Sequence, residues 1–261
     1  MRLRARQSAT FAFIGSAIVG SAFVSGLPAQ ALPLDQIVQK LEPVPVFMII
    51  DDKGVPLVAT ILNGNKKHAI VGIFIKEKDA EEFVDQLKTK NPDLAKTAKV
   101  IPVSLGKVYK LEQANESKPD APTFTYVPEQ QDVKAALSVL QQNGQKVNRF
   151  SGTPLFVAKT GKNKDYLSIK QNNQEEIPFF FNQNELQSLV ERFKQQKPNI
   201  ASTVTIEVVS LEDLLQTLKT RNNAGLSEVV LVPPKESLDY VRSLQSNQNQ
   251  FPPSHSPSST P

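Results

Sequence analysis

Residues 74–111 read FIKEKDAEEFVDQLKTKNPDLAKTAKVIPVSLGKVYKL, and they align without a gap on residues 180–217, which read FFNQNELQSLVERFKQQKPNIASTVTIEVVSLEDLLQT. Nine aligned pairs are identical, where average composition gives roughly two by chance. The identities are Phe74/Phe180, Val84/Val190, Lys88/Lys194, Pro92/Pro198, Ala95/Ala201, Thr97/Thr203, Val103/Val209, Ser104/Ser210 and Leu105/Leu211. The chain therefore contains a tandem repeat of one unit, with an offset of 106 residues between the aligned stretches.

The match continues on both sides of this stretch. Residues 44–47 (VPVF) correspond to residues 153–156 (TPLF), and Val127-Pro128 corresponds to Val232-Pro233. The repeat is too long for a solenoid, whose units span about 20 to 50 residues. We therefore expect an α/β (α+β) fold made of two pseudo-symmetric lobes, one for each copy of the unit.

Each unit is predicted to contain three strands, a helix, a strand, a short helix, a strand and a helix, with the strands in a mixed sheet. In the first copy the strands are expected at residues 46–50, 57–62, 69–75, 99–104 and 124–127. Apolar residues at positions 80, 83, 84 and 87 have the spacing of an amphipathic helix that ends at Asn91-Pro92. In the second copy, Asn182 and Glu185 have the spacing of a capping box, and Lys76 replaces the cap residue in the first.

The N-terminus has the pattern of a secretory signal peptide. Arg2, Arg4 and Arg6 precede an apolar run at residues 11–24, and Ala29-Gln30-Ala31 has the form of a cleavage site. The alternative is an uncleaved anchor, but the run is shorter than the ~20 residues that a spanning helix needs. We expect a signal peptide (1–31), two repeats (32–148 and 149–245) and a disordered tail (246–261) rich in Ser, Pro, Asn and Gln.

Composition argues against most enzyme classes. The chain has no Cys, so thiolate nucleophiles and disulfides are excluded, and His68 and His255 are its only histidines. The adjacent pairs Asp51/Asp52 and Glu81/Glu82 are interpreted as turn and helix-surface residues, because neighbouring side chains diverge. Without residues 1–31 the net charge falls from +4 to about +1, which does not favour nucleic-acid binding. We therefore predict no catalytic, metal or cofactor residues.

Three consecutive aromatic residues, Phe179, Phe180 and Phe181, follow Ile177-Pro178 in a strand-like run. Such a run is typical of a strand buried on both faces, or of a strand that packs in its own core and also contacts the other lobe. Alternatively, Phe179 and Phe181 lie on one face and line an exposed groove for apolar segments of client polypeptides. The sequence leaves both possibilities open.

Several segments resemble one family, the 22-kDa Tic family of the translocon at the inner envelope of chloroplasts, and specifically its cyanobacterial members. They are residues 44–47 (VPVF), 90–92 (KNP), 100–105 (VIPVSL), 124–128 (FTYVP) and 152–156 (GTPLF). The resemblance covers residues 32–243. It implies a soluble protein of the periplasm, with a possible thylakoid-lumen pool, and two similar lobes with apolar pockets.

The resemblance also implies a function. We expect a chaperone-like protein-transport factor that binds unfolded or translocating proteins and assists the assembly of outer-membrane β-barrels, with the assembly machinery as a partner. A docking subunit of that machinery, without client binding, is the alternative. A hydrolase that uses carboxylates would need two converging acids with perturbed pKa values in a pocket.

Overall fold

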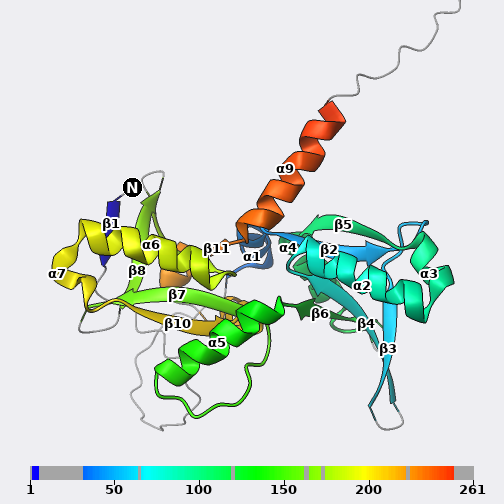
Figure 1. The fold of residues 1–261 in the computed structure, drawn as a ribbon, viewed down its shortest axis with the longest axis horizontal. Coiled ribbons are helices and arrows are strands. Elements are labelled where there is room, and N and C mark those ends of the chain that lie inside the picture. The colour runs from blue at the N-terminus through cyan, green and yellow to red at the C-terminus, as the bar shows by residue number, and fades with distance from the viewer. Residues whose placement is uncertain are drawn as a thin grey trace, which may run out of the picture.

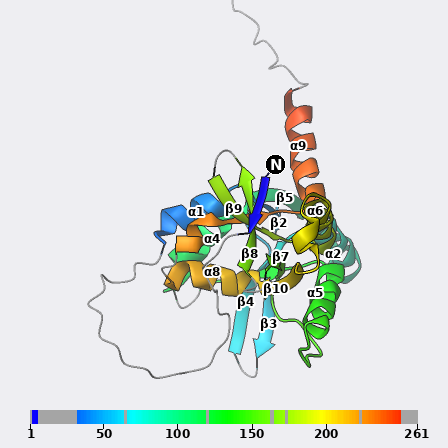
Figure 2. The same cartoon turned by 90° about the vertical axis from the view of Figure 1, so that its left-hand side faces the viewer.

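The computed structural model describes residues 2–5, 32–63, 66–118, 121–161, 165–171, 174–221 and 224–249. Two lobes lie side by side, and each is built on its own sheet (Figure 1). Helix α9 rises from between them, as the view turned by 90° also shows (Figure 2). The mixed α+β architecture agrees with the prediction.

The N-terminal lobe begins with a helix and continues through the first copy of the repeat. Its elements are α1 (Leu34–Leu41), β2 (Pro45–Ile50), β3 (Val58–Asn63), β4 (Lys66–Phe74), α2 (Glu77–Lys90), α3 (Pro92–Thr97), β5 (Lys99–Ser104), α4 (Leu105–Asn115) and β6 (Thr123–Val127). The sheet order is β3-β4-β2-β5, and β6 pairs with β4. Gly54, at φ 80°, makes the turn after β2 as the Asp-Asp-Lys-Gly sequence predicts.

The C-terminal lobe contains the second copy. Helix α5 (Gln130–Gln142), the last helix of the first copy, precedes the second copy. The elements of the second copy are β7 (Pro154–Thr160), β8 (Asp165–Gln171), β9 (Gln174–Phe180), α6 (Gln183–Gln196), α7 (Pro198–Ala201), β10 (Thr205–Ser210), α8 (Leu211–Thr220), the 3-10 helix η1 (Ala224–Glu228), β11 (Val229–Val232) and α9 (Lys235–Asn249). An additional strand, β1 (Arg2–Ala5), pairs antiparallel with β8.

The two sheets repeat the same pairings in the same register. Pro45 of β2 pairs with Ser104 of β5, and Pro154 of β7 pairs with Ser210 of β10. The parallel pair β4–β6 ends at Phe74 and Val127, and the parallel pair β9–β11 ends at the corresponding residues of the second copy. This agreement supports the interpretation of a tandem repeat.

The inner faces of the two sheets meet in one shared core, together with α1, α4 and α8. Both lobes contribute to this core through side chains such as Ile73 and Leu105 from the first copy and Leu155 and Leu211 from the second. One buried cluster therefore spans the lobe boundary, so packing ties the two lobes together.

Phe179 and Phe181 belong to this shared core, with exposed fractions of 2% and 1%. The interpretation of the pair as an exposed client-binding surface is therefore wrong. Strand β9 lies inside the sheet, so one face of the aromatic run meets the other lobe, and Phe180, on the opposite face, packs in the outer core of its own lobe.

The last helix of each copy crosses to the other lobe. Helix α5 follows β6 but packs on β7 and β10, whereas α9 follows β11 and packs on β2. Asn182 caps α6 by accepting from the N–H groups of Asn184 and Glu185. The reciprocal half of the capping box is wrong, because the Glu185 carboxylate accepts from the N–H of Lys235 at the start of α9 instead.

The predicted segments at the two ends are only partly described. The cleavage-site residues Ala29 and Ala31 lie outside the described residues, and β1 falls within the predicted signal peptide. The tail was expected to start at residue 246, but α9 continues to Asn249. Among the described residues, no helix combines the length and the apolar character that a membrane span requires.

Candidate functional site

The outer face of the N-terminal sheet carries an apolar groove of about 360 Å³. We call it the outer groove, and it lies between strands β3, β4 and β6 on one side and helices α2 and α3 on the other. Its lining contains no charged residue and consists of Ile49, Leu57, Val58, Ala59, Ile70, Gly72, Phe74, Phe83, Leu87, Leu94, Thr125 and Val127.

The groove exists because this lobe has smaller side chains than its repeat partner. Ala59 pairs with Ile70, and the corresponding residue of the second copy, Ile169, pairs with Glu176. Likewise Leu87 aligns with Phe193, which is fully buried. Smaller residues at equivalent positions leave space that the second copy fills.

The crossing of the two final helices also leaves the groove open. In the C-terminal lobe, Ala136 and Val139 of α5 are buried against the outer face of the sheet. In the N-terminal lobe, α9 instead places Tyr240 edge-on against Phe47, with ring centroids 5.6 Å apart. Helix α9 therefore covers the β2 end of the outer face and does not line the outer groove.

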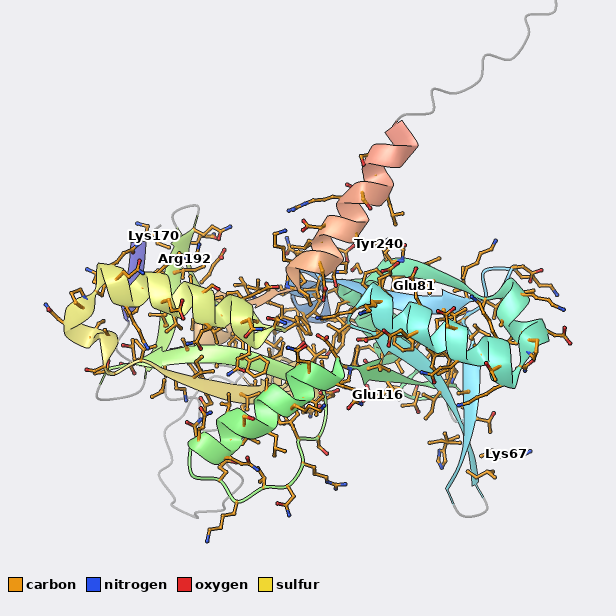
Figure 3. All side chains as sticks on the ribbon, viewed as in Figure 1. Lys67, Glu81, Glu116, Lys170, Arg192 and Tyr240 are labelled. Atoms are coloured by element: carbon orange, nitrogen blue, oxygen red, sulfur yellow. The ribbon has the colours of Figure 1, made fainter. Side chains whose placement is uncertain are left out.

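Large apolar side chains extend the groove to its rim. The lining residues Val58 and Phe83 are 50% and 40% exposed, and Ile61, on the same face of β3 as Ala59, is 48% exposed. The β3–β4 hairpin projects from the body of the lobe, with Lys67 near its far end (Figure 3). An apolar groove with an apolar rim is typical of a surface that binds apolar ligands or polypeptide segments.

The residues considered for chemistry lie apart from this groove. His68 is exposed on strand β4. Asp51 accepts from the backbone N–H groups of Lys53 and Val55, as a turn residue does. Among the described residues, no three His, Cys, Asp or Glu side chains are grouped as a metal site requires.

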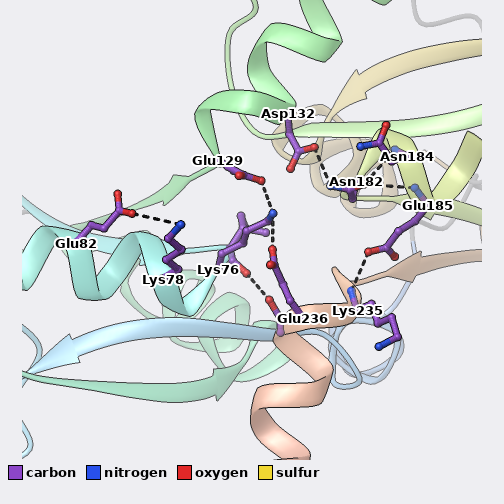
Figure 4. Close-up of polar contacts among 12 residues, drawn as sticks. Lys76, Lys78, Glu82, Glu129, Asp132, Asn182, Asn184, Glu185, Lys235 and Glu236 are labelled. Carbon is purple, nitrogen blue, oxygen red and sulfur yellow. Dashed lines mark hydrogen bonds and ion pairs between the residues drawn. The ribbon is translucent and has the colours of Figure 1, made fainter.

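Four helices, α2, α5, α6 and α9, begin close together at the lobe junction (Figure 4). Lys76, just before α2, forms ion pairs with Glu129 before α5 and with Glu236 of α9. Burial would lower the pKa of Lys76, but its hydrogen bonds to these two carboxylates outweigh burial and raise the pKa. The lysine therefore stays charged and ties three helix starts together.

Asp132 is buried at the same junction and accepts a hydrogen bond of 3.3 Å from the Asn182 amide. Burial is the main cause that raises its pKa to about 7, with a further contribution from the Glu129 carboxylate. The protonation state of Asp132 therefore changes near neutral pH, in the interface between α5 and α6.

Two further acids, Glu77 and Glu81, lie close together on α2. Burial, and then a hydrogen bond and repulsion from Glu81, raise the pKa of Glu77 to about 7, while Tyr240 of α9 lowers it. The hydrolase alternative requires two converging acids with perturbed pKa values in a pocket, but Glu77 and Glu81 lie on one helix and neither lines the outer groove. We interpret them as a titrating contact between α2 and α9.

Sequence reasoning missed the outer groove. Phe83 and Leu87 were recognised only as part of the apolar stripe of an amphipathic helix. The available signal was the alignment of the two copies, which sets Leu87 against the larger Phe193. The match of Ala59 with Ile169 follows from the strand register.

The family model described as Tic22-like matches residues 2–243. The chain belongs to the Tic22-like family. Two curated relatives from Arabidopsis thaliana are "Protein TIC 22, chloroplastic", 25% identical over 85% of this chain and 75% of the relative, and "Protein TIC 22-like, chloroplastic", 25% identical over 78% and 62%.

Two solved structures share the fold. Anabaena Tic22, described under protein transport, is 30% identical, with a TM-score of 0.72 over 81% of this chain and 97% of that chain. Tic22 from Plasmodium falciparum is 20% identical, with a TM-score of 0.59 over 81% and 98%. The likeness therefore extends over both lobes of the Tic22-like fold.

Proposed function

We propose that this protein is a chaperone-like transport factor that holds unfolded or translocating polypeptides by their apolar side chains in the outer groove. The observation that carries the proposal is an open groove of about 360 Å³ with no charged residue in its lining. Two findings support it: the chain belongs to the Tic22-like family, and the Anabaena relative is described under protein transport.

We place this activity in the periplasm, reached by a cleaved signal peptide, with a possible pool in the thylakoid lumen. The clients are proteins that cross this space, including outer-membrane β-barrel precursors, and the assembly machinery of these barrels is the partner. The N-terminal pattern of Arg2, Arg4 and Arg6 before an apolar run supports export.

The test compares two variants of the same strand. Ala59→Ile fills the groove with the residue that the second copy carries, whereas Thr60→Ile adds similar bulk at the next residue of β3, which does not line the groove. Ala59→Ile should suppress the aggregation of an unfolded outer-membrane protein less than wild type does, and Thr60→Ile should act as wild type. If wild type, Ala59→Ile and Thr60→Ile suppress aggregation equally, the outer groove is not the client-binding site.

A docking subunit without client binding is the second candidate, and helix α9 favours it. This helix projects from between the lobes (Figure 1) and offers a surface to which the assembly machinery can bind. A docking subunit should give a stable complex in pull-downs and no effect on aggregation. Crosslinking in the intact periplasm, followed by identification of the trapped proteins, separates clients from a machine.

A further inference from the structure

Strand β3 forms one wall of the outer groove and one edge of the N-terminal sheet. Within the described residues, its ladder partner is β4 alone, from Val58 paired with Val71 to Asn63 paired with Lys66. On its other side, the backbone N–H and C=O groups of residues 58–62 form no ladder with any residue that the structure describes. A strand with one free side can accept another strand.

This edge lacks the features that usually protect edge strands. Residues 58–62 read VATIL, with no charge and no proline, and Ile61 is exposed together with Val58 and Leu62. The opposite edge, β5, carries Lys99 and Pro102. Charged residues and proline discourage strand addition, and an exposed apolar edge without them invites it.

The second copy of the repeat carries a strand at the corresponding position. Strand β8 corresponds to β3, and in the precursor β1, which belongs to the predicted signal peptide, pairs antiparallel along it, from Arg2 opposite Lys170 to Ala5 opposite Leu167. Residues 167–170 of β8 correspond to residues 57–60 beside the outer groove. An extended segment at this position is therefore compatible with the sheet of this repeat unit.

We propose that β3 binds clients by strand addition: an extended client segment pairs with the free edge of residues 58–62 and places alternate apolar side chains in the outer groove. This inference rests on the proposed function and names its client class. The preferred segments are amphipathic strands with apolar residues at every second position, because side chains of a strand alternate between its two faces.

The same alternation makes the mode testable. Along an added strand, every second residue points its N–H toward β3, and side chains alternate with the same period. All client residues whose side chains enter the groove therefore direct their N–H groups to the same side of the added strand, either toward β3 or away from it. Methylating the backbone nitrogen of every apolar residue, or of every polar residue, removes the hydrogen bonds to β3 in only one of the two peptides.

The experiment uses protein recovered from the periplasm after expression of the full chain. The probes are a nine-residue peptide that alternates Val with Lys or Thr, and its two N-methylated forms, with affinity measured by fluorescence anisotropy. One methylated form should bind about tenfold or more weakly, since several backbone hydrogen bonds are lost, and the other should stay within about threefold. Hydrogen exchange of the amides of β3 should slow on binding, while the edge strand β5 stays unchanged.

Other outcomes overturn the inference. Equal binding of both methylated peptides would mean that side chains alone hold the client, so that strand addition fails and the proposed function stands. Failure of the parent peptide, while the protein still suppresses client aggregation and Ala59→Ile abolishes this effect, would have the same meaning. Self-association through β3 in sedimentation, without peptide binding, would assign the edge to a second copy of the chain. Loss of all client binding would remove the proposed function as well.

Discussion

Asp132→Asn should flatten the pH dependence of stability between pH 5 and pH 8. Burial raises the pKa of Asp132 from 3.8 in its ordinary state to about 7. Between these values the folded protein holds a proton that the unfolded chain has released, so the free energy of unfolding falls as pH rises. Asparagine keeps an oxygen that can accept from Asn182 and removes the titration.

The size of the effect follows from the pKa shift. From pH 5 to the folded pKa the window is about two pH units, and each unit corresponds to about 1.4 kcal/mol, so the upper limit is about 2.7 kcal/mol. The effect of the Lys76 charge is already contained in this pKa, and screening by solvent at the partly exposed junction lowers the expected loss to about 1–2 kcal/mol. From pH 5 to pH 8, the free energy of unfolding should therefore fall by about 1–2 kcal/mol more for wild type than for Asp132→Asn.

The assay is urea unfolding followed by circular dichroism at pH 5, 6, 7 and 8, because the chain has no Trp for fluorescence. Ionisable groups that do not contact Asp132 are present in both proteins, so their contributions cancel in the comparison. Asp93→Asn, which changes an exposed carboxylate on α3, is the control. A variant at position 132 with the same pH slope as wild type would refute the reasoning.

Three further changes test the packing and the turns. Phe181→Ser should cost at least about 3–5 kcal/mol and lower the unfolding midpoint of both lobes together, since this ring is buried in the shared core; weakened client binding at unchanged stability would contradict its burial. Ser237→Ala should cost about 1 kcal/mol in urea unfolding, because its hydroxyl donates to the buried carbonyl of Ile75 at 3.1 Å; a neutral result would mean that this contact does not hold α9. Gly152→Ala should lower the melting temperature more than Gly54→Ala does. Both glycines have positive φ, but only at position 152 would a new Cβ lie 2.5 Å from the Glu212 carboxylate. Equal decreases in melting temperature would exclude this clash.

The repeat allowed the architecture to be predicted with little ambiguity. The two aligned copies predicted the same strands twice, and hydrophobic spacing located α2 and α6. These features depend on local periodicity and on turn residues such as Gly54, which act over a few positions. The strand register was not predicted, and the structure shows that the two copies share it.

The lobe on which α5 and α9 each pack could not be predicted in the same way. Both helices follow a Val-Pro pair and have apolar residues at helical spacing, but no local pattern states which lobe a helix will cover. The choice is made by tertiary contacts such as Tyr240 on Phe47 and the ion pairs of Lys76. Sequence reasoning also assigned Phe179 to one of two environments, and only the position of the second lobe decides between them.

A shared core explains how one lobe can keep an open groove. The outer core of the C-terminal lobe is extensive, whereas that of the N-terminal lobe has Phe47, Ile49, Phe74 and Ala80 as its buried members. The stability of the N-terminal lobe must then come mainly from the shared core, to which its inner face contributes.

Filling the groove should therefore stabilise the protein and impair its function. Ala59→Ile adds three carbon atoms, which at about 0.8 kcal/mol for each buried CH₂ gives up to about 2 kcal/mol of additional stability if the side chain enters the groove without strain. A gain in melting temperature together with a loss of client binding is the result that a functional groove predicts, because binding sites are often retained at the expense of stability. If Ala59→Ile lowers the melting temperature and leaves client binding intact, the space at Ala59 is needed for packing and the client binds elsewhere.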